Sequence, residues 1–376
     1  MPSSTSSSEI PLRKIPDSQW SSIMIIALVV FLLSMLGWEI KARAMQHIPG
    51  TYSEVNNLEA MWAQERRKLD DPTNQTRLVL LGSSRMLWGA DLNIMEQQFG
   101  TRPLQLAIAG TGPALMLKGI VDDTDFDGLI LIGVTPFLFN RLDEGFLGAG
   151  ALEWYEGVSP SKRSGFAIEQ FLSDYFGFLD EGFKLFQLLD RYNTFTNREG
   201  SIPLEENDWK LGNAYADRQT DMWPPVEIVP SFDNTQITNF WMAGLRRPPE
   251  TPERMAEMVT SSAEYFVPLI EKLRARGGDA VFIRMPDSGK YVEHVTKTNY
   301  RELTWQPMSE AFDAPAINCM DFPQLSTDLE IPEWSHLSRK SQDEWSRVIV
   351  PFVEKSYADK RGQTIYELMG IPQPQR

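Results

Sequence analysis

Short apolar runs alternate with amphipathic stretches along much of this chain. The runs 77–81, 104–108 and 129–134 are almost continuously apolar, as are strands that are buried on both faces of a sheet. Between them, residues 91–99 and 114–121 repeat apolar positions at helical spacing. Strands that alternate with helices form a parallel sheet with helices on its faces, so this part of the chain is predicted to be α/β.

The alternation stops after Pro136 and resumes near residue 250. The intervening segment 137–249 is rich in Phe, Trp, Gly and acidic residues, and we predict that it is a cap inserted into the sheet domain. Residues 77–136 and 250–357 then form the sheet domain, and 358–376 form a C-terminal tail. The remaining predicted elements are a helix at 252–276, strands at 280–284 and 316–318, and a closing helix at 338–354.

The N-terminal region contains a candidate membrane span. Residues 20–38 are mostly apolar and have a tryptophan at each end, as helices with both ends at bilayer interfaces do. This stretch would form about 28 Å of helix, close to the thickness of the hydrocarbon layer. No Ala-x-Ala site follows it, so we predict an uncleaved transmembrane helix rather than a signal peptide. The Ser-rich tail 1–19 is predicted to be disordered, and 39–76 to be a stalk.

Charge and composition exclude several classes of function. The net charge of -15 argues against a nucleic-acid partner, because phosphate binding needs clustered cations. A single cysteine, Cys319, excludes an intramolecular disulfide and is predicted to be an inert core residue. With three scattered histidines, the chain offers little for a structural zinc site, and we expect no metal and no cofactor. Basic residues flank the span on both sides, so the charges do not specify its orientation.

Two short motifs suggest a serine hydrolase site. Gly82 would let the chain turn at the end of the first strand, and Ser83 and Ser84 follow it directly. A serine hydroxyl becomes nucleophilic when an imidazole that is oriented by a carboxylate removes its proton. Glu333 and His336 are three residues apart, so one loop before the closing helix can present both. The alternative is that the serines only cap the next helix.

Other polar residues follow the remaining strands. Right-handed crossovers bring successive strand ends to one edge of the sheet, so Ser84, Gly110 and Thr135 are expected to converge there. Arg85 and Arg284 are candidates for binding an anionic substrate, although both could instead pair with surface carboxylates. A nucleotide site near Gly110 is disfavoured, because Gly-Thr-Gly-Pro-Ala-Leu lacks the third glycine at the needed spacing and a Walker lysine.

Taken in order, these blocks resemble those of the SGNH, or GDSL-like, hydrolase superfamily, which has a flavodoxin-like three-layer parallel sheet. The resemblance implies that Ser84 is the nucleophile, where the family has Gly-Asp-Ser, and that Glu333 and His336 replace its Asp-x-x-His. It implies that the backbone N–H groups of Ser84 and Gly110 form the oxyanion hole. Thr135 stands where many members have asparagine, so the third donor of this hole departs from the pattern.

Within this superfamily, the chain is most similar to membrane-anchored extracytoplasmic proteins of cell-surface polymer O-acylation. Alginate O-acetylation proteins and the D-alanyl transfer protein of teichoic acid modification are examples. The features that carry this similarity are Gly-Ser-Ser, the third block without its asparagine, and the N-terminal anchor. This resemblance implies a serine acyl esterase or acyltransferase in the periplasm or outside the cell. Its partners would be an acylated polysaccharide or acyl donor and a polytopic membrane acyltransferase. The alternatives are a non-catalytic scaffold protein of a cell-envelope assembly and a plain carbohydrate esterase or lipase.

Overall fold

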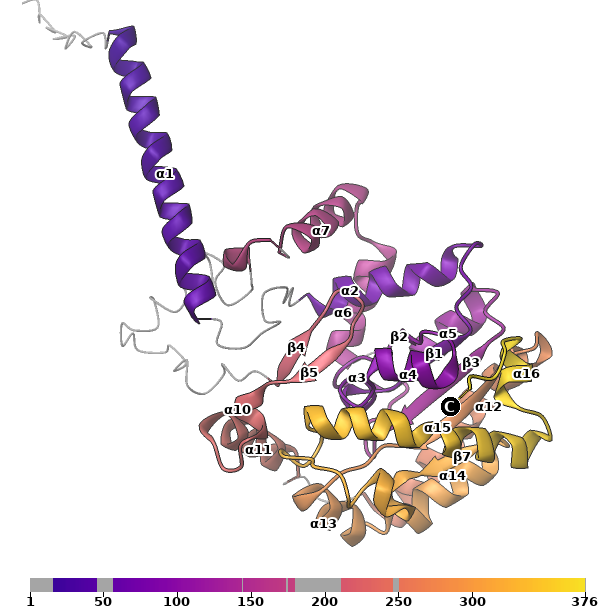
Figure 1. The fold of residues 1–376 in the computed structure, drawn as a ribbon. Coiled ribbons are helices and arrows are strands. Elements are labelled where there is room, and N and C mark those ends of the chain that lie inside the picture. The colour runs from indigo at the N-terminus through magenta and orange to yellow at the C-terminus, as the bar shows by residue number, and fades with distance from the viewer. Residues whose placement is uncertain are drawn as a thin grey trace, which may run out of the picture.

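The centre of the molecule is a five-stranded parallel sheet (Figure 1). Its spatial order is β2-β1-β3-β6-β7, which is 2-1-3-4-5 when these strands are counted along the chain. The α/β class predicted from the sequence is therefore confirmed. The strands are β1 (Leu78–Leu81), β2 (Leu104–Gln105), β3 (Leu129–Val134), β6 (Asp279–Arg284) and β7 (Ala316–Asn318). The computed structural model describes residues 16–45, 57–143, 145–173, 175–179, 211–245 and 250–375.

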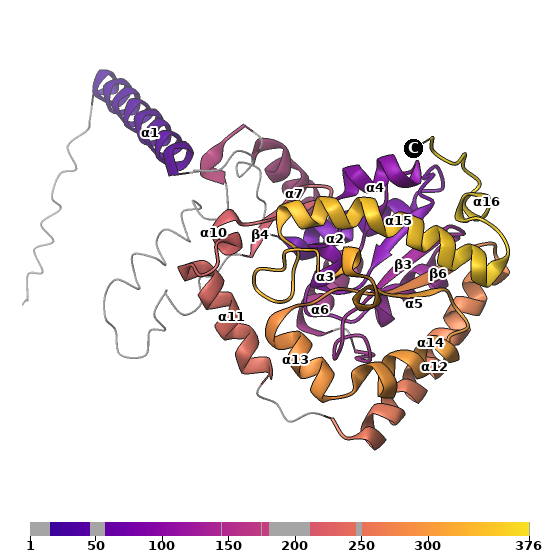
Figure 2. The same cartoon turned by 60° about the horizontal axis from the view of Figure 1, so that its bottom comes forward.

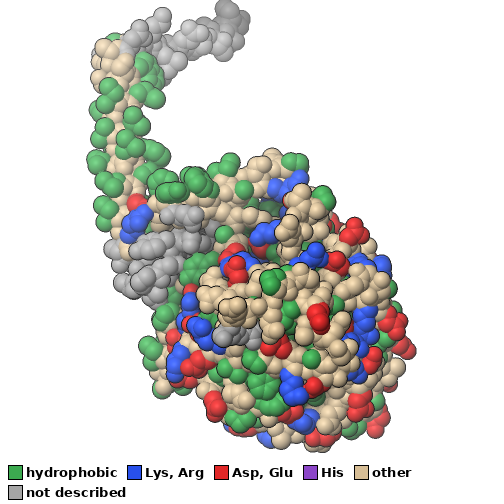
Figure 3. All heavy atoms as spheres, turned by 45° about the vertical axis from the view of Figure 1, so that its right-hand side comes forward, with side chains coloured by type: hydrophobic (Ala, Val, Ile, Leu, Met, Phe, Trp, Pro, Cys, Tyr) green, Lys and Arg blue, Asp and Glu red, His purple; other side chains and the backbone are tan. Residues whose placement is uncertain are grey.

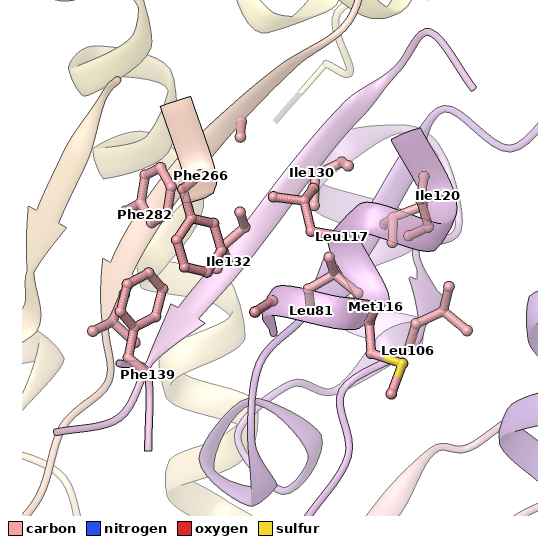
Figure 4. Close-up of a cluster of buried hydrophobic side chains, with 14 of the residues drawn as sticks. Leu81, Leu106, Met116, Leu117, Ile120, Ile130, Ile132, Phe139, Phe266 and Phe282 are labelled. Atoms are coloured by element: carbon pink, nitrogen blue, oxygen red, sulfur yellow. The ribbon is translucent and has the colours of Figure 1, made fainter. Parts of the chain in front are cut away.

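Side chains from the strands alternate between two apolar layers because successive residues of a strand point to opposite faces. Val79 and Leu81 pack into one layer, whereas Leu78 and Leu80 pack into the other. The first layer, part of which is shown in Figure 4, is covered by α2 (Leu58–Arg66), α5 (Ala114–Asp123), α12 (Pro252–Ala275) and α14 (Gln306–Ala311). The second is covered by α3 (Ser84–Leu87), α4 (Leu92–Phe99), α15 (Arg339–Arg361) and α16 (Ile365–Met369).

Helix ends in this domain have the expected capping chemistry. The side chain of Ser338 accepts a hydrogen bond from the backbone of Ser341 at the start of α15, and Gly362 ends that helix with a positive φ of 69°. Shorter elements connect the main ones. They are the 3-10 helices η1 (Arg67–Asp70), η5 (Cys319–Asp321) and η6 (Pro323–Leu325), the helix α13 (Gly289–Lys297) and the π-helical segment η4 (Arg301–Trp305).

Helix α1 (Asp17–Met45) projects from the domain (Figure 1). Its segment Ser18–Arg43 is long and apolar enough to cross a membrane, with a mean hydropathy of 2.5, and it includes the predicted span. Most of its large apolar side chains are exposed.

Two segments outside the predicted domain limits belong to the packed domain. The predicted stalk includes α2, whose Trp62 is buried in the first layer and donates a hydrogen bond from Nε1 to the carbonyl of Leu106 at 3.0 Å. The predicted C-terminal tail includes α16, whose Ile365, Tyr366 and Met369 are buried in the second layer. Both limits are therefore wrong: each of these helices buries an apolar face on the sheet domain.

The segment inserted after β3 contains elements on more than one side of the domain (Figures 1 and 2). Helix α6 packs along α2, and the hairpin β4–β5 continues toward α11. The elements of this segment are α6 (Gly145–Glu156), α7 (Pro160–Ser173), η2 (Gly177–Leu179), β4 (Gly212–Ala214), β5 (Thr220–Met222), α10 (Pro224–Glu227) and α11 (Phe232–Leu245).

Arg218 joins this hairpin to the sheet. Its guanidinium is fully buried and donates to three backbone carbonyls, those of Gln105, Ala107 and Leu58. Burial lowers the pKa of Arg218 to about 10. One side chain of the inserted segment therefore holds together the sheet-edge strand, its continuation and the start of α2.

Candidate active site

The serine motif lies in a tight turn between β1 and α3. Gly82 has a positive φ of 142°, and a Cβ there would lie 2.8 Å from the carbonyl oxygen of Gly133 on the neighbouring strand. A Cβ on Gly133 would itself lie 2.8 Å from Cβ of Met86. Two glycines thus allow α3 to start directly above the ends of β1 and β3. Ser84, the first residue of α3, is half-buried at this point.

Ser83 and Thr135 form a hydrogen bond through their side-chain oxygens across the ends of β1 and β3. Both residues are buried, and the Ser83 side chain makes no capping hydrogen bond to α3. The sequence suggested Thr135 as a third oxyanion donor, but in the structure its hydroxyl is hydrogen-bonded to that of Ser83. Gly110 lies after β2, is exposed and has a positive φ of 66°. Gly110, Ser84 and Thr135 follow three neighbouring parallel strands, β2, β1 and β3, in the sheet.

The second motif forms a buried pair before α15. The Nδ1 atom of His336 lies 2.9 Å from Oε1 of Glu333, and this oxygen also accepts the backbone N–H of His336. The side chains of both residues are completely buried. The other ring nitrogen, Nε2, is buried and has no hydrogen-bond partner among the described residues. The carboxylate thus fixes the ring through one nitrogen and leaves the other available for a ligand or a proton.

Trp241, a residue of the inserted segment, was not predicted from the sequence to belong to the site. Its indole Nε1–H donates to Oε2 of Glu333, the oxygen that His336 does not use. The indole and the imidazole also lie side by side, with ring centroids 5.8 Å apart. Helix α11 therefore completes the hydrogen bonding of the buried carboxylate. No short sequence motif indicated this, because a tryptophan in an apolar helical stretch is an ordinary packing residue.

The loop after β6 supports the histidine loop. The backbone N–H of Ser288 donates to the carbonyl of Trp334 at 3.0 Å, and its hydroxyl donates to the carbonyl of Ile331 at 3.0 Å. Trp334 has a positive φ of 74°, a conformation that a bulky side chain disfavours. Its indole occupies the space where Gly289 lacks a side chain: a Cβ there would lie 2.4 Å from the ring. The turn between Glu333 and His336 is thus strained and held by its neighbours.

Arg85 connects the two motifs. Its Nε donates to the hydroxyl of Ser335 at 3.2 Å, which joins α3 to the histidine loop. Its Nη1 donates to Asp287 at 2.7 Å, and Arg284 donates to the same carboxylate. All three charged groups are buried, and the Arg85 guanidinium lies over the ring of Tyr291 at 4.9 Å. Both arginines therefore pair with a carboxylate, which was the alternative to substrate binding. The carboxylate is buried, however, and does not lie on the surface.

Arg284 and Asp287 also line a cavity of about 250 Å³. Part of its wall is Tyr300, which is fully buried and whose hydroxyl has no partner among the described residues. Burial raises the pKa of this hydroxyl, so it is protonated at neutral pH. This cavity is lined by neither Ser84 nor His336.

Cys319 is buried, and burial raises the pKa of its thiol to about 12, so it is inert as predicted. Within the described ranges, no group of three His, Cys, Asp or Glu side chains could hold a metal ion. Comparison with protein-family models, curated proteins and solved structures finds no match for this chain.

Proposed function

We propose that this protein is a membrane-anchored serine acyl esterase or acyltransferase that acts on acylated exported or cell-surface polysaccharide. The observation that carries the proposal is the state of His336: Nδ1 is paired with the buried Glu333, and Nε2 is buried without a partner in the described part of the chain. A ring held in this way can act as a general base. Arg85, next to Ser84, joins the serine turn to the histidine loop through the hydroxyl of Ser335.

The proposed mechanism requires the Ser84 hydroxyl to reach Nε2 of His336, which has no hydrogen-bond partner among the described residues. Glu333 accepts a hydrogen bond from Nδ1–H, so the lone pair of His336 is on Nε2 and would take the proton of the Ser84 hydroxyl. The serine oxygen attacks the acyl carbonyl, and the backbone N–H groups of Ser84 and Gly110 would stabilise the oxyanion. His336 then returns the proton to the departing sugar oxygen. An acyl-serine remains, and water or a second hydroxyl receives the acyl group while His336 acts as base again.

The sheet supports the same proposal. The strand order 2-1-3-4-5 is that of flavodoxin-like sheets, which bind their ligands at the carboxyl ends of the strands where the order reverses. In this chain the reversal lies between β1 and β3, and Ser84 and Thr135 follow those two strands. The resemblance to SGNH hydrolases rests on the sequence blocks around Ser84, Gly110 and Thr135 together with Glu333 and His336, and this strand order is compatible with it. It also motivates the proposed extracytoplasmic location and a polytopic acyltransferase as partner.

Turnover of p-nitrophenyl acetate by the full-length chain in detergent tests the proposal. Ser84→Ala and His336→Ala should each lower kcat by about 10³-fold or more, because nucleophile and base act as one unit. Ser164→Ala and His294→Ala, at more exposed positions, are matched controls that should retain turnover. If the two site variants keep the wild-type rate, the catalytic proposal is wrong.

Hydrolysis and transfer are separated by supplying an acceptor. With p-nitrophenyl acetate as donor, the wild-type chain should move acetyl groups to an unacetylated polyuronate if it is a transferase. Release only to water would indicate an esterase.

A second candidate is a non-catalytic scaffold on the same fold. It is favoured by the engagement of Thr135 with Ser83, since the usual third oxyanion donor is then missing. Wild-type chain that neither turns over the ester nor reacts at Ser84 with a fluorophosphonate would support the scaffold.

A further inference from the structure

Helix α7 and the turn after it carry an exposed apolar face. Ile168, Phe171 and Tyr175 are about 60% exposed, and Phe176 is 42% exposed. Ile168 and Phe171 are three residues apart and lie on one side of α7, and the ring of Tyr175, in the turn after the helix, is 5.3 Å from that of Phe171. Another side chain of the helix, Phe166, is buried against Trp154 of α6. Helix α7 is therefore fixed to the domain through one face and offers an apolar face to its surroundings.

The same turn is bound to the C-terminal end of α1. Arg43 donates to the carbonyl of Tyr175 at 2.7 Å, and Glu39 accepts the backbone N–H groups of Gly177 and Phe178 at 3.1 and 3.2 Å. The rings of Trp38 and Phe178 are 5.4 Å apart. In Figure 1, the turn that follows α7 and contains η2 lies beside the end of α1 that is nearer the domain. These contacts place the apolar face where the candidate span Ser18–Arg43 ends.

We propose that α7 and η2 form an interfacial membrane segment, whose apolar face inserts among the headgroups of a phospholipid bilayer. This inference rests on the proposed crossing of the membrane by α1. Hydrophobic side chains gather on the surface of the domain beside α1 (Figure 3). Lys162 and Arg163 are exposed at the start of α7 and suit anionic lipid headgroups. Because the turn after α7 is bound to the end of α1, lipid covers the apolar face of α7 when α1 crosses a bilayer.

The consequence is a domain with two membrane contacts. Helix α6 connects α7 to α2, which packs on the sheet. A second contact would therefore hold the sheet at a fixed angle to the bilayer instead of leaving it on a free tether.

Site-specific fluorescence in liposomes tests the proposal. Full-length chains that carry Phe171→Cys, Phe232→Cys or Leu32→Cys are labelled with an NBD iodoacetamide and reconstituted in phosphatidylcholine and phosphatidylglycerol. The native Cys319 is buried and stays unlabelled. Phe232, in α11, is 62% exposed and matches Phe171 in type and exposure, whereas Leu32 reports on the span. Quenching is measured with nitroxide lipids and with aqueous iodide.

The label at 171 should be quenched by nitroxide lipids, as the label at 32 is, and its iodide quenching constant should be about threefold or more below that at 232. Lipid quenching at 32 but not at 171 would overturn this inference and leave the anchor intact. No lipid quenching at 32 would overturn the anchor and this inference together. A label at 171 that is protected from iodide but not quenched by lipid would show that protein covers the face, which also overturns it.

Discussion

The central sheet and the segment inserted after β3 are packed into one molecule by different interactions. In the sheet, alternate apolar residues of each strand enter two continuous layers. The inserted segment also packs apolar side chains on the domain, but single buried polar side chains add contacts that the sheet layers lack. Arg218 binds three carbonyls, Thr220 donates to the carbonyl of Leu87 at 2.6 Å, and Trp241 donates to Glu333.

This difference affects how each region responds to substitution. Apolar packing is spread over many contacts of about 0.1–0.2 kcal/mol each, so a small truncation costs little. A buried polar side chain leaves its partners unsatisfied when it is removed, at about 1–3 kcal/mol for each group. The inserted segment should therefore be the more sensitive region to single conservative changes, although its packing is less regular.

Arg218→Met should produce the largest effect. The change keeps much of the side-chain volume but leaves the carbonyls of Gln105, Ala107 and Leu58 without their donor. We expect the free energy of unfolding to fall by about 3–5 kcal/mol, which chemical denaturation would measure. Arg102→Met, at a partly exposed arginine that pairs with Glu96 and Asp217, is the matched control and should cost about 1 kcal/mol or less. Equal losses of stability in the two variants would show that the three carbonyl contacts of Arg218 do not hold the inserted segment to the sheet.

Trp241→Phe should come next and act on activity. It keeps an aromatic ring beside His336 but removes the N–H that Glu333 accepts. A hydrogen bond to a charged group contributes about 1.5–3 kcal/mol, so we expect kcat for p-nitrophenyl acetate to fall about 10- to 100-fold. Phe232→Leu, at an exposed position of the same helix, should leave kcat unchanged. A Trp241→Phe variant with the wild-type kcat would show that the inserted segment does not support the catalytic pair.

The sequence predicted those parts of the molecule whose signal is local or periodic. The strands and main helices of the sheet were predicted because apolar runs and helical spacing follow directly from burial. Glu333 and His336 were found because their spacing is short. Helix α2 was mistaken for a stalk because its charged Glu65 and Arg66 suggested a solvated helix, although both are buried and paired with Lys68 and Asp70.

Residues that act across long sequence separations left no such signal. Trp241 and Glu333 are 92 positions apart, and Arg85 and Asp287 are 202 apart. Nothing in either neighbourhood specifies the partner. The pairing depends on how the inserted segment folds back on the sheet, which periodicity does not encode.

Gly289→Ala tests whether a loop of the sheet domain can be as sensitive as the inserted segment. Gly289 has a φ of 49°, and an added Cβ would meet the indole of Trp334 at 2.4 Å. We expect a loss of about 1–3 kcal/mol in stability together with reduced kcat, because the strained histidine loop must move. Gly370→Ala is the matched control: φ is 65° and the added Cβ meets nothing within 4 Å, so it should cost about 1 kcal/mol and leave kcat unchanged. Equal effects on kcat would contradict the proposed support.

Ile132→Val should have the smallest effect and completes the comparison. Ile132 is completely buried in the central strand β3, and the change removes one methylene group from the first layer. Its cost should be about 0.5–1.5 kcal/mol without a change in kcat, as measured by denaturation and ester turnover. Ile228→Val, at an exposed position of the inserted segment, should cost less than about 0.5 kcal/mol. Ile132→Val could instead destabilise the protein as much as Arg218→Met does. The sheet would then depend on tight packing as strongly as the inserted segment depends on its buried polar groups. That result would remove the contrast between the two regions.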